Sequence, residues 1–302
     1  MELLKFLEGI RSPFLDTVIG LVTRLGEETV AIAVLCAIFW CISKKTAYGI
    51  SITYLLSGLT VQGMKIIFRI DRPWIAHPEL NPVHSALEHA TGYSFPSGHT
   101  QSATSLLGSL GAAIKQVPLK IVFFFLVILV AFSRMYLGVH TLLDVTVSLL
   151  ITSLIIFFTI KLFSGNKISK QRELTISLIM ILYAIIVIVI AAVLHSRGRI
   201  EQNYLSDCLK AAGAGIGFAV GMFFERVYIQ FSVKSKNILW QIIKYALGIA
   251  GVLAIKEGLK LIIGTGLVVD TLRYFLMLLW VAALYPLIIK KFFTAKETQS
   301  EK

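Results

Sequence analysis

The succession of long apolar segments along its 302 residues constrains this chain more than any other feature. An α-helix needs about 20 apolar residues to cross the hydrocarbon layer of a bilayer. Segments close to that length lie at residues 27–43, 46–68, 99–116, 118–134, 140–162, 174–195, 204–225, 237–258 and 268–289. The sequence therefore predicts an all-α fold, a polytopic membrane helix bundle with about nine transmembrane helices.

The composition agrees with an integral membrane protein. Hydrophobic residues make up 56% of the chain, charged residues make up 15%, and the mean hydropathy is +0.80, whereas soluble domains are less apolar and more highly charged. The net charge of +12 comes from short clusters between the apolar segments rather than from one basic face. We therefore expect a membrane as the environment and no nucleic acid as a partner.

The basic clusters lie in alternate loops. Lysine and arginine residues follow the first, third, fifth, seventh and ninth apolar segments. The positive-inside rule assigns such loops to the cytoplasm. We therefore expect a multi-pass protein of the cell membrane, with its N-terminus outside and its C-terminus in the cytoplasm.

Neither a metal site nor a disulfide framework is predicted. Cys36, Cys41 and Cys208 form neither an even set nor a metal-ligand spacing. The polar residues of the longest outward loop, residues 72–97, fit no metal motif either. We expect no metal and no cofactor.

Charged and polar residues gather in three short stretches at the outward ends of the apolar segments. These are KIIFRIDRP at 65–73, PSGH at 96–99 and SRMYLGVHTLLD at 133–144. Charged groups beside hydrocarbon are costly unless they line a polar site. The stretches therefore predict one outward-facing site, with the candidate residues Lys65, Arg72, Ser97, Gly98, His99, Arg134, His140 and Asp144.

The first two stretches have the chemistry of an anion site. Lys65 and Arg72 are seven residues apart, so two helical turns would bring them to one face, where they could clamp one anion. Ser97 and Gly98 directly precede an apolar helix, whose free N-terminal amides bind anions. His99 at the helix start is placed to donate a proton.

The third stretch contains a histidine–carboxylate pair. His140 and Asp144 are four residues apart at the start of a helix, so Asp144 can hold one ring nitrogen and leave the other free as a nucleophile. A lone pair of this kind is more often a structural hydrogen bond. Arg134 and the other cations nearby favour an active site.

In chain order the stretches are Lys-x6-Arg-Pro, Pro-Ser-Gly-His and Ser-Arg-x5-His-x3-Asp. This pattern resembles the signature of the type 2 phosphatidic acid phosphatase superfamily, which includes lipid phosphate phosphatases and vanadium haloperoxidase-like proteins. The resemblance covers about residues 27–163. It implies an integral membrane phosphatase that hydrolyses a phosphate or pyrophosphate monoester of a lipid without a metal. Polyprenyl pyrophosphate, phosphatidate and phosphatidylglycerol phosphate are the substrates it implies.

The resemblance also implies a role for each site residue. His140 would attack phosphorus to form a phosphohistidine, and Asp144 would orient His140. His99 would protonate the leaving oxygen and then activate water. The phosphate oxygens would be held by Lys65, Arg72, Ser97, Gly98 and Arg134.

Three other functions fit parts of the pattern. A vanadium haloperoxidase holds vanadate in a similar pocket, but those proteins are soluble. A lipid phosphotransferase uses the same intermediate and differs only in the acceptor, so the sequence does not separate it from a phosphatase. A transporter or flippase would also have charged helix ends, yet the cations of this chain converge at one membrane face rather than at mid-membrane.

The chain divides into four expected parts. These are an N-terminal interfacial amphipathic segment (1–26), a catalytic transmembrane core (27–163), additional C-terminal transmembrane helices (164–293) and a polar tail (294–302). In the additional helices, glycines at every fourth position form a small-residue ridge that permits close helix packing. We expect internal packing, with a homo-oligomer as the alternative, through the glycine ridge of Gly213, Gly217 and Gly221.

Overall fold

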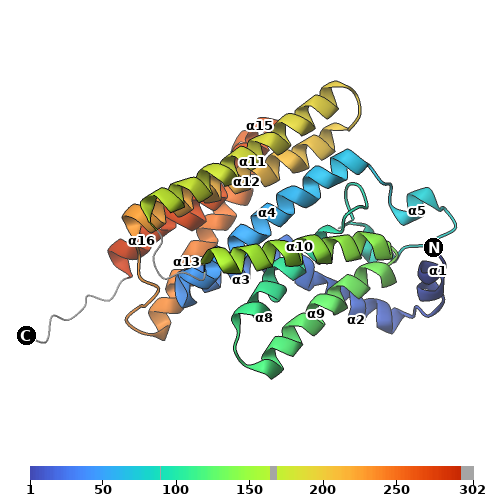
Figure 1. Ribbon diagram of the computed structural model, residues 1–302, viewed down its shortest axis with the longest axis horizontal. Helices are drawn as coiled ribbons and strands as arrows, with labels where there is room; N and C mark the ends of the chain where they lie inside the picture. Colours follow the sequence, from blue (N-terminus) through green and yellow to red (C-terminus); the bar gives the residue numbers. More distant parts are fainter. Residues whose placement is uncertain (89, 164–168, 294–302) are drawn as a thin grey trace, which may run out of the picture. The chain divides into compact units, whose positions relative to one another are not determined.

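The computed structural model describes residues 1–88, 90–163 and 169–293 (Figure 1). These residues form helices and no strand, so the predicted all-α fold is confirmed. The expected polar tail at 294–302 lies outside the described residues. Contacts divide the chain into two units, each described by itself below. The first unit contains residues 1–32, 49–165 and 187–208, and the second contains residues 33–48, 166–186 and 209–302.

The helices follow one another along the chain with short connections. Up to the middle of the chain they are α1 (Glu2–Gly9), α2 (Pro13–Thr23), η1 (Arg24–Gly26), α3 (Glu28–Ala37), η2 (Ile38–Ile42), α4 (Lys44–Phe68), α5 (Pro73–Ala76), α6 (His84–Leu87), α7 (Gly98–Ala103), η3 (Thr104–Gly108), α8 (Ser109–Ala113), α9 (Val117–Tyr136) and α10 (Leu142–Phe163). After these come α11 (Lys170–Ser196), α12 (Gln202–Phe224), η4 (Glu225–Ile229), α13 (Ile238–Leu253), η5 (Ala254–Gly258), α14 (Leu259–Ile263), α15 (Leu267–Leu279), η6 (Trp280–Leu284) and α16 (Tyr285–Phe292).

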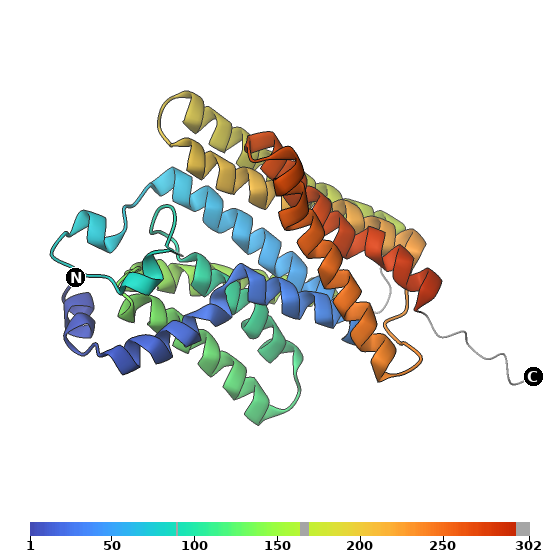
Figure 2. The ribbon, with the colours of Figure 1, turned by 180° about the vertical axis from the view of Figure 1, so that it is seen from behind.

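Most of these helices are long and apolar enough to span a bilayer. Within the described residues, seven pass this test, and the number is eight if the bent pair Pro13–Gly26 and Glu28–Ile42 counts as one span. The bend between the two helices of that pair is 52°, and it is visible in the blue part of the chain in Figure 2. The expected segment 99–116 forms α7, η3 and α8, which together are shorter than a full span. The predicted number of about nine helices is therefore close to the observed one.

Hydrogen bonds between side chains join the helices of the first unit. The Thr53 hydroxyl of α4 donates to Thr159 of α10 over 3.1 Å. The Gln101 amide of α7 donates to the Ser57 hydroxyl of α4 over 2.7 Å, and Ser57 shares a 2.9 Å hydrogen bond with Ser105. Polar contacts of this kind favour specific helix pairing in an apolar environment. They link α4 to the two helices that carry the second and third sequence stretches.

The N-terminal helices pack against α9, close to the turn that leads into α10. Arg11 donates from Nε to the Tyr136 carbonyl oxygen over 2.9 Å and from Nη1 to the Asn81 carbonyl oxygen. A Cβ at Gly138 would lie 2.8 Å from the Arg11 guanidinium, and the φ of Gly138 is +77°. Glycine is therefore required at this turn for both space and conformation. In Figure 1, α9 and α10 extend from this turn as neighbouring helices.

In the second unit, the glycine ridge packs against α15 and η6. A Cβ at Gly213 or Gly217 would collide with a backbone carbonyl oxygen of α15, and a Cβ at Gly221 would lie 2.6 Å from Cβ of Ala282. Internal packing of the ridge is therefore confirmed. A homo-oligomer through the glycine ridge stays a prediction. It would need the same face of the ridge that α15 and η6 of this chain already cover. Figure 2 shows α13 crossing the red helices α15 and α16 of this unit.

Candidate active site

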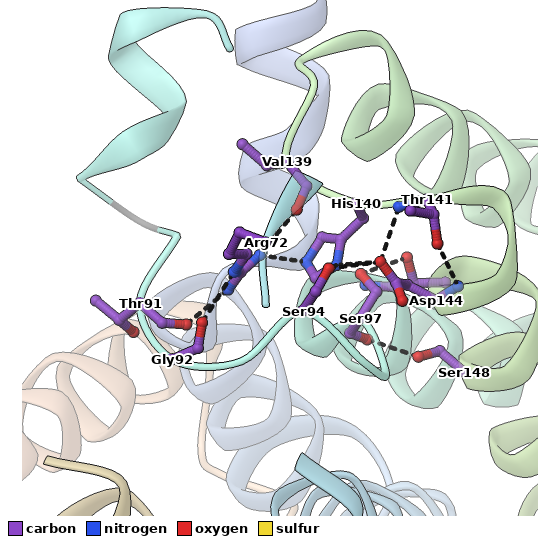
Figure 3. A network of polar contacts seen from close by, with 11 residues as sticks. Arg72, Thr91, Gly92, Ser94, Ser97, Val139, His140, Thr141, Asp144 and Ser148 are labelled. Carbon is purple, nitrogen blue, oxygen red and sulfur yellow. Dashed lines mark hydrogen bonds and ion pairs between the residues drawn. The ribbon is translucent and has the colours of Figure 1, made fainter. Parts of the chain in front are cut away.

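The three sequence stretches come together in the first unit (Figure 3). The first stretch runs from the end of α4 to the start of α5, the second begins α7, and the third connects α9 to α10. Figure 3 shows the Arg72 side chain on one side of the His140 ring and Asp144 on the other. A continuous set of hydrogen bonds therefore joins Arg72, His140, Asp144 and Ser97.

Lys65 and Arg72 do not share a helix face, so that part of the sequence prediction was wrong. Helix α4 ends at Phe68, and Arg69 adopts a left-handed φ of 51° while its N–H donates to the Lys65 carbonyl oxygen over 2.9 Å. Such a residue closes a helix. Arg72 then lies in extended backbone immediately before Pro73, where the α region is disfavoured.

The Arg72 guanidinium is buried and held by backbone carbonyl oxygens. It donates to the carbonyl oxygens of Gly92 over 3.0 Å, Thr91 over 2.6 Å and Val139 over 3.0 Å. Its Nη1 also lies 2.8 Å from Nε2 of His140. The cation is therefore fixed in direct contact with the candidate nucleophile.

His140 and Asp144 form the expected pair, with 3.4 Å between His140 Nδ1 and Asp144 Oδ2. Asp144 Oδ2 also accepts from the Thr141 N–H over 2.8 Å. Because a guanidinium can only donate, His140 Nε2 must accept from Arg72, and the proton of the neutral ring then sits on Nδ1 facing Asp144. In this tautomer the lone pair of the ring lies on Nε2, on the side away from Asp144.

The surroundings of His140 favour the neutral ring. Helix α10 begins at Leu142, so His140 lies in the connection before the spanning helix. Burial lowers the pKa of His140 well below its usual value, and the positive charges of Arg72, Arg134 and Lys65 lower this pKa further. These surroundings favour the neutral imidazole of His140, whose Nε2 lone pair accepts from Arg72 in this structure.

Ser97 directly precedes α7, as the sequence predicted, and its side chain caps that helix. Its hydroxyl oxygen accepts from the Thr100 N–H over 3.4 Å and from the Thr100 hydroxyl over 2.9 Å. Its own N–H donates to the Asp144 carbonyl oxygen over 3.2 Å, and its carbonyl oxygen accepts from Ser148 over 2.8 Å. A Cβ at Gly98 would meet no atom within 4 Å. The start of α7 is thus anchored to α10 and has open space beside Gly98.

His99 lies in the first turn of α7, and its Nε2 is buried. Among the described residues this atom has no hydrogen-bond partner. Its electrostatic interactions are with Arg134, His140, Lys65 and Arg72, which places it in the same cluster. A Cβ at Gly26 would lie 2.7 Å from the His99 carbonyl oxygen, so a glycine there lets η1 pack against α7.

Arg134, in the last turn of α9, is 1% exposed. Its Nη1 donates to the Thr23 hydroxyl over 2.7 Å, while Nε and Nη2 are buried and have no partner in the described part of the chain. Buried donors are nearly always satisfied in proteins, by water where no protein group is near, so these two nitrogens are able to donate to a water or a bound anion. Lys65 Nζ lies 4.0 Å from the position of a Cβ at Gly92, the residue whose carbonyl oxygen accepts from Arg72.

Ser94 is a site residue that the sequence reasoning missed. Its hydroxyl donates to Asp144 Oδ2 over 2.6 Å and lies 3.4 Å from His140 Nδ1. A lone serine in a loop carries no recognisable pattern. Thr141 was also missed, although Thr-x-x-Asp at 141–144 is a readable capping box, and the Asp144 N–H donates back to the Thr141 hydroxyl over 3.3 Å.

Two family models match this chain. One covers the candidate site residues, and the other covers most of the helices that follow them. The PAP2 superfamily model matches residues 46–168, and the model described as PAP2 superfamily phosphatase, transmembrane extension, matches residues 209–297. The chain belongs to the PAP2 superfamily. The first match contains every candidate site residue, and the second begins in the additional helices and extends into the polar tail.

Curated relatives of this PAP2 protein carry the names of lipid phosphatases. Phosphatidylglycerophosphatase B of Bacillus subtilis is 29% identical over 175 residues, which cover 54% of this chain and 82% of that protein. Undecaprenyl-diphosphatase BcrC of the same organism is 28% identical over 163 residues, covering 52% and 80%. Undecaprenyl-diphosphatase of Sulfolobus acidocaldarius is 27% identical over 180 residues, covering 58% and 83%. Together with the apolar helices, these likenesses support a multi-pass membrane lipid phosphatase.

Proposed function

We propose that this PAP2 protein hydrolyses a phosphate or pyrophosphate monoester of a lipid through a phosphohistidine on His140. One observation carries the proposal. His140 Nε2 is in contact with the buried cation Arg72 over 2.8 Å, while Nδ1 faces Asp144. A nucleophile held between a cation and a carboxylate suits attack on an anionic phosphorus centre.

In the first step, Arg72 donates to a phosphate oxygen instead of to His140 Nε2, the freed Nε2 lone pair attacks phosphorus, and the bond from phosphorus to the lipid oxygen breaks. His99, protonated when the negative charge of the bound phosphate offsets the surrounding cations, gives a proton to that oxygen. The lipid product leaves as an alcohol, or as a monophosphate when the substrate is a pyrophosphate. Asp144 stabilises the positive charge on the His140 ring without taking its proton. In the second step, water attacks phosphorus, His99 accepts a proton from the water, and inorganic phosphate and free His140 are released.

The cations supply the electrostatic part of catalysis. Phosphoryl transfer places negative charge on the phosphate oxygens, and fixed donors aimed at them lower the barrier. Lys65, Arg72 and Arg134 provide the charge, and Ser97 and the Gly98 amide provide hydrogen bonds at the start of α7. The described residues hold no group of three or more His, Cys, Asp or Glu side chains that could bind a metal. The three cations, Ser97 and the Gly98 amide support a mechanism in which protein groups, and no metal, stabilise the phosphate charge.

Exposed apolar side chains next to the site support a lipid substrate. Phe68 and Ile70 precede Arg72, and Leu142 and Leu143 follow His140; all four are exposed. A lipid could keep its tail against such side chains while its phosphate reaches the cations. The charge pattern of the loops supports a site at the outer face, where polyprenyl pyrophosphate, phosphatidate or phosphatidylglycerol phosphate would be presented at headgroup level.

Phosphate release by the purified protein in lipid nanodiscs tests this proposal. We expect release from at least one lipid of that panel in the presence of EDTA, inhibition by vanadate, complete loss in His140→Ala and a strong decrease in Asp144→Asn. Labelled substrate should leave acid-labile phosphate on the wild-type chain. Full activity of a well-folded His140→Ala protein would disprove the mechanism. Label found on a second lipid instead of in solution would identify a phosphotransferase.

A further inference from the structure

An aromatic stack joins α12 to the loop that holds the active site. Tyr204, in the first turn of α12, stacks on Tyr93 with 4.2 Å between the ring centroids and an angle of 9° between the ring planes. The two residues are far apart in sequence but belong to the same unit. Tyr204 lies outside both family matches, between residues 168 and 209.

The loop at 91–94, which contains Tyr93, connects the two halves of the site. Before Tyr93, the carbonyl oxygens of Thr91 and Gly92 accept from the Arg72 guanidinium over 2.6 and 3.0 Å. After Tyr93, the Ser94 hydroxyl donates to Asp144 over 2.6 Å. A movement of Tyr93 would therefore disturb the cation and the carboxylate together.

Tyr204 also covers the residue before Tyr93. Gly92 has a left-handed φ of +71°, and a Cβ there would lie 3.7 Å from the Tyr204 ring. Glycine adopts such a conformation without strain, but it has no side chain with which to make packing contacts of its own. Packing by the Tyr204 ring compensates for this missing side chain.

We propose that Tyr204 is a positioning residue that, by stacking on Tyr93, holds the 91–94 loop in the geometry that Arg72 and Asp144 need. The inference rests on the proposed function of the site. The Tyr204 ring touches the loop and acts on the reaction through it. It gives the additional helices an indirect part in the reaction, since the ring that supports the loop around the phosphate-binding arginine comes from α12.

The test is a double-mutant cycle on phosphate release and on vanadate inhibition. Loss of an aromatic stack should decrease kcat/KM and weaken vanadate inhibition by about 3- to 10-fold in Tyr204→Ala and in Tyr93→Ala. The double variant should be no worse than either single one, because both remove the same stack. Asn203→Ala, an exposed neighbour on α12, is the matched control and should behave as wild type.

Conservative variants separate the ring from the hydroxyl. The Tyr204 hydroxyl also interacts electrostatically with Arg72. Tyr204→Phe keeps the ring and should keep kcat/KM and vanadate inhibition, whereas a loss in Tyr204→Phe equal to that in Tyr204→Ala would overturn the stacking inference. If Tyr204→Ala does not fold, Tyr204→Leu, which keeps an apolar side chain without a stack, should show the same loss.

The outcomes distinguish this inference from the proposed function. An active wild-type protein with an unaffected Tyr204→Ala variant overturns the inference alone. Losses that multiply in the double variant also overturn it, since the two tyrosines would then act independently. A wild-type protein that releases no phosphate from any lipid overturns the proposed function and this inference together.

Discussion

Two buried groups of charged side chains in this protein differ in how their charges are paired. The candidate active-site cluster consists of Arg72, Arg134, His140 and Asp144 in the first unit. The paired cluster consists of Lys44, Tyr48, Glu173, Glu225 and Arg226 in the second unit. Burying charged side chains in an apolar environment costs free energy. Each cluster must therefore have interactions that offset this cost or a function that requires the charges.

In the paired cluster every buried carboxylate has a cation. Glu225, which is fully buried, accepts from Lys44 over 2.8 Å and from the Tyr48 hydroxyl. Glu173 forms an ion pair with Arg226 over 2.7 Å. The charges balance inside the chain. Such pairs hold helices in register and call for no ligand.

In the candidate active-site cluster the cations outnumber the carboxylates. In the described part of the chain, neither Arg72 nor Arg134 forms an ion pair. The Asp144 carboxylate instead accepts hydrogen bonds from the Ser94 hydroxyl and the Thr141 N–H and faces the His140 ring. Two Arg134 nitrogens have no hydrogen-bond partner among the described residues. The comparison teaches that excess buried positive charge indicates a site for an external anion, whereas balanced charge indicates structure.

Among the variants that test this comparison, Arg134→Ala should have the largest effect. We expect kcat for phosphate release to fall by roughly 10²- to 10³-fold, the effect of removing one good transition-state donor. The melting temperature without substrate should stay the same or rise, because an unpaired buried cation is removed. Activity assays and thermal melts of the same preparation measure both effects.

Vanadate provides the control for Arg134→Ala. It should raise the melting temperature of the wild-type protein by binding the folded state and should raise that of Arg134→Ala much less. A variant that melts far below wild type while keeping its kcat would show that Arg134 is structural.

Glu225→Ala should have the opposite effect, lowering stability without changing kcat. Removing this carboxylate leaves Lys44 and the Tyr48 hydroxyl unpaired, and breaking a buried pair lowers the free energy of unfolding by roughly 3–5 kcal/mol. The kcat of the folded protein should not change. Glu225→Gln, which keeps an acceptor but loses the charge, should be destabilised less. A large loss of kcat at unchanged stability would contradict the structural role of the paired cluster.

Ser94→Ala should give the smallest of these effects. The variant loses the 2.6 Å hydrogen bond to Asp144 Oδ2, and a hydrogen bond to a charged group is worth enough to decrease kcat by roughly 10-fold. Ser133→Ala is the matched control, because that buried hydroxyl donates only to the Val130 carbonyl oxygen of its own helix, over 2.6 Å. Equal kcat values for Ser94→Ala and Ser133→Ala would show that Ser94 makes no contribution to the reaction.

The sequence was sufficient for the helical membrane fold and for the residue types of the site. Hydropathy and helix length are sums over neighbouring residues, so they can be read without a structure. The spacing from His140 to Asp144 is also local, since four residues make one helical turn. The spacing from Lys65 to Arg72 was misleading, because a left-handed residue at Arg69 ended the helix between them.

Only the tertiary structure decided which groups hold these side chains in place. The acceptors of Arg72 are backbone carbonyl oxygens of Thr91, Gly92 and Val139, and every residue type has such an oxygen. Ser94 and Tyr204 likewise belong to no local pattern. Their roles depend on contacts between segments that are distant in sequence, and such contacts are set by packing of the whole chain. The sequence alone therefore determined the membrane helices and the chemistry of the three stretches, while the tertiary structure determined the geometry that makes them one site.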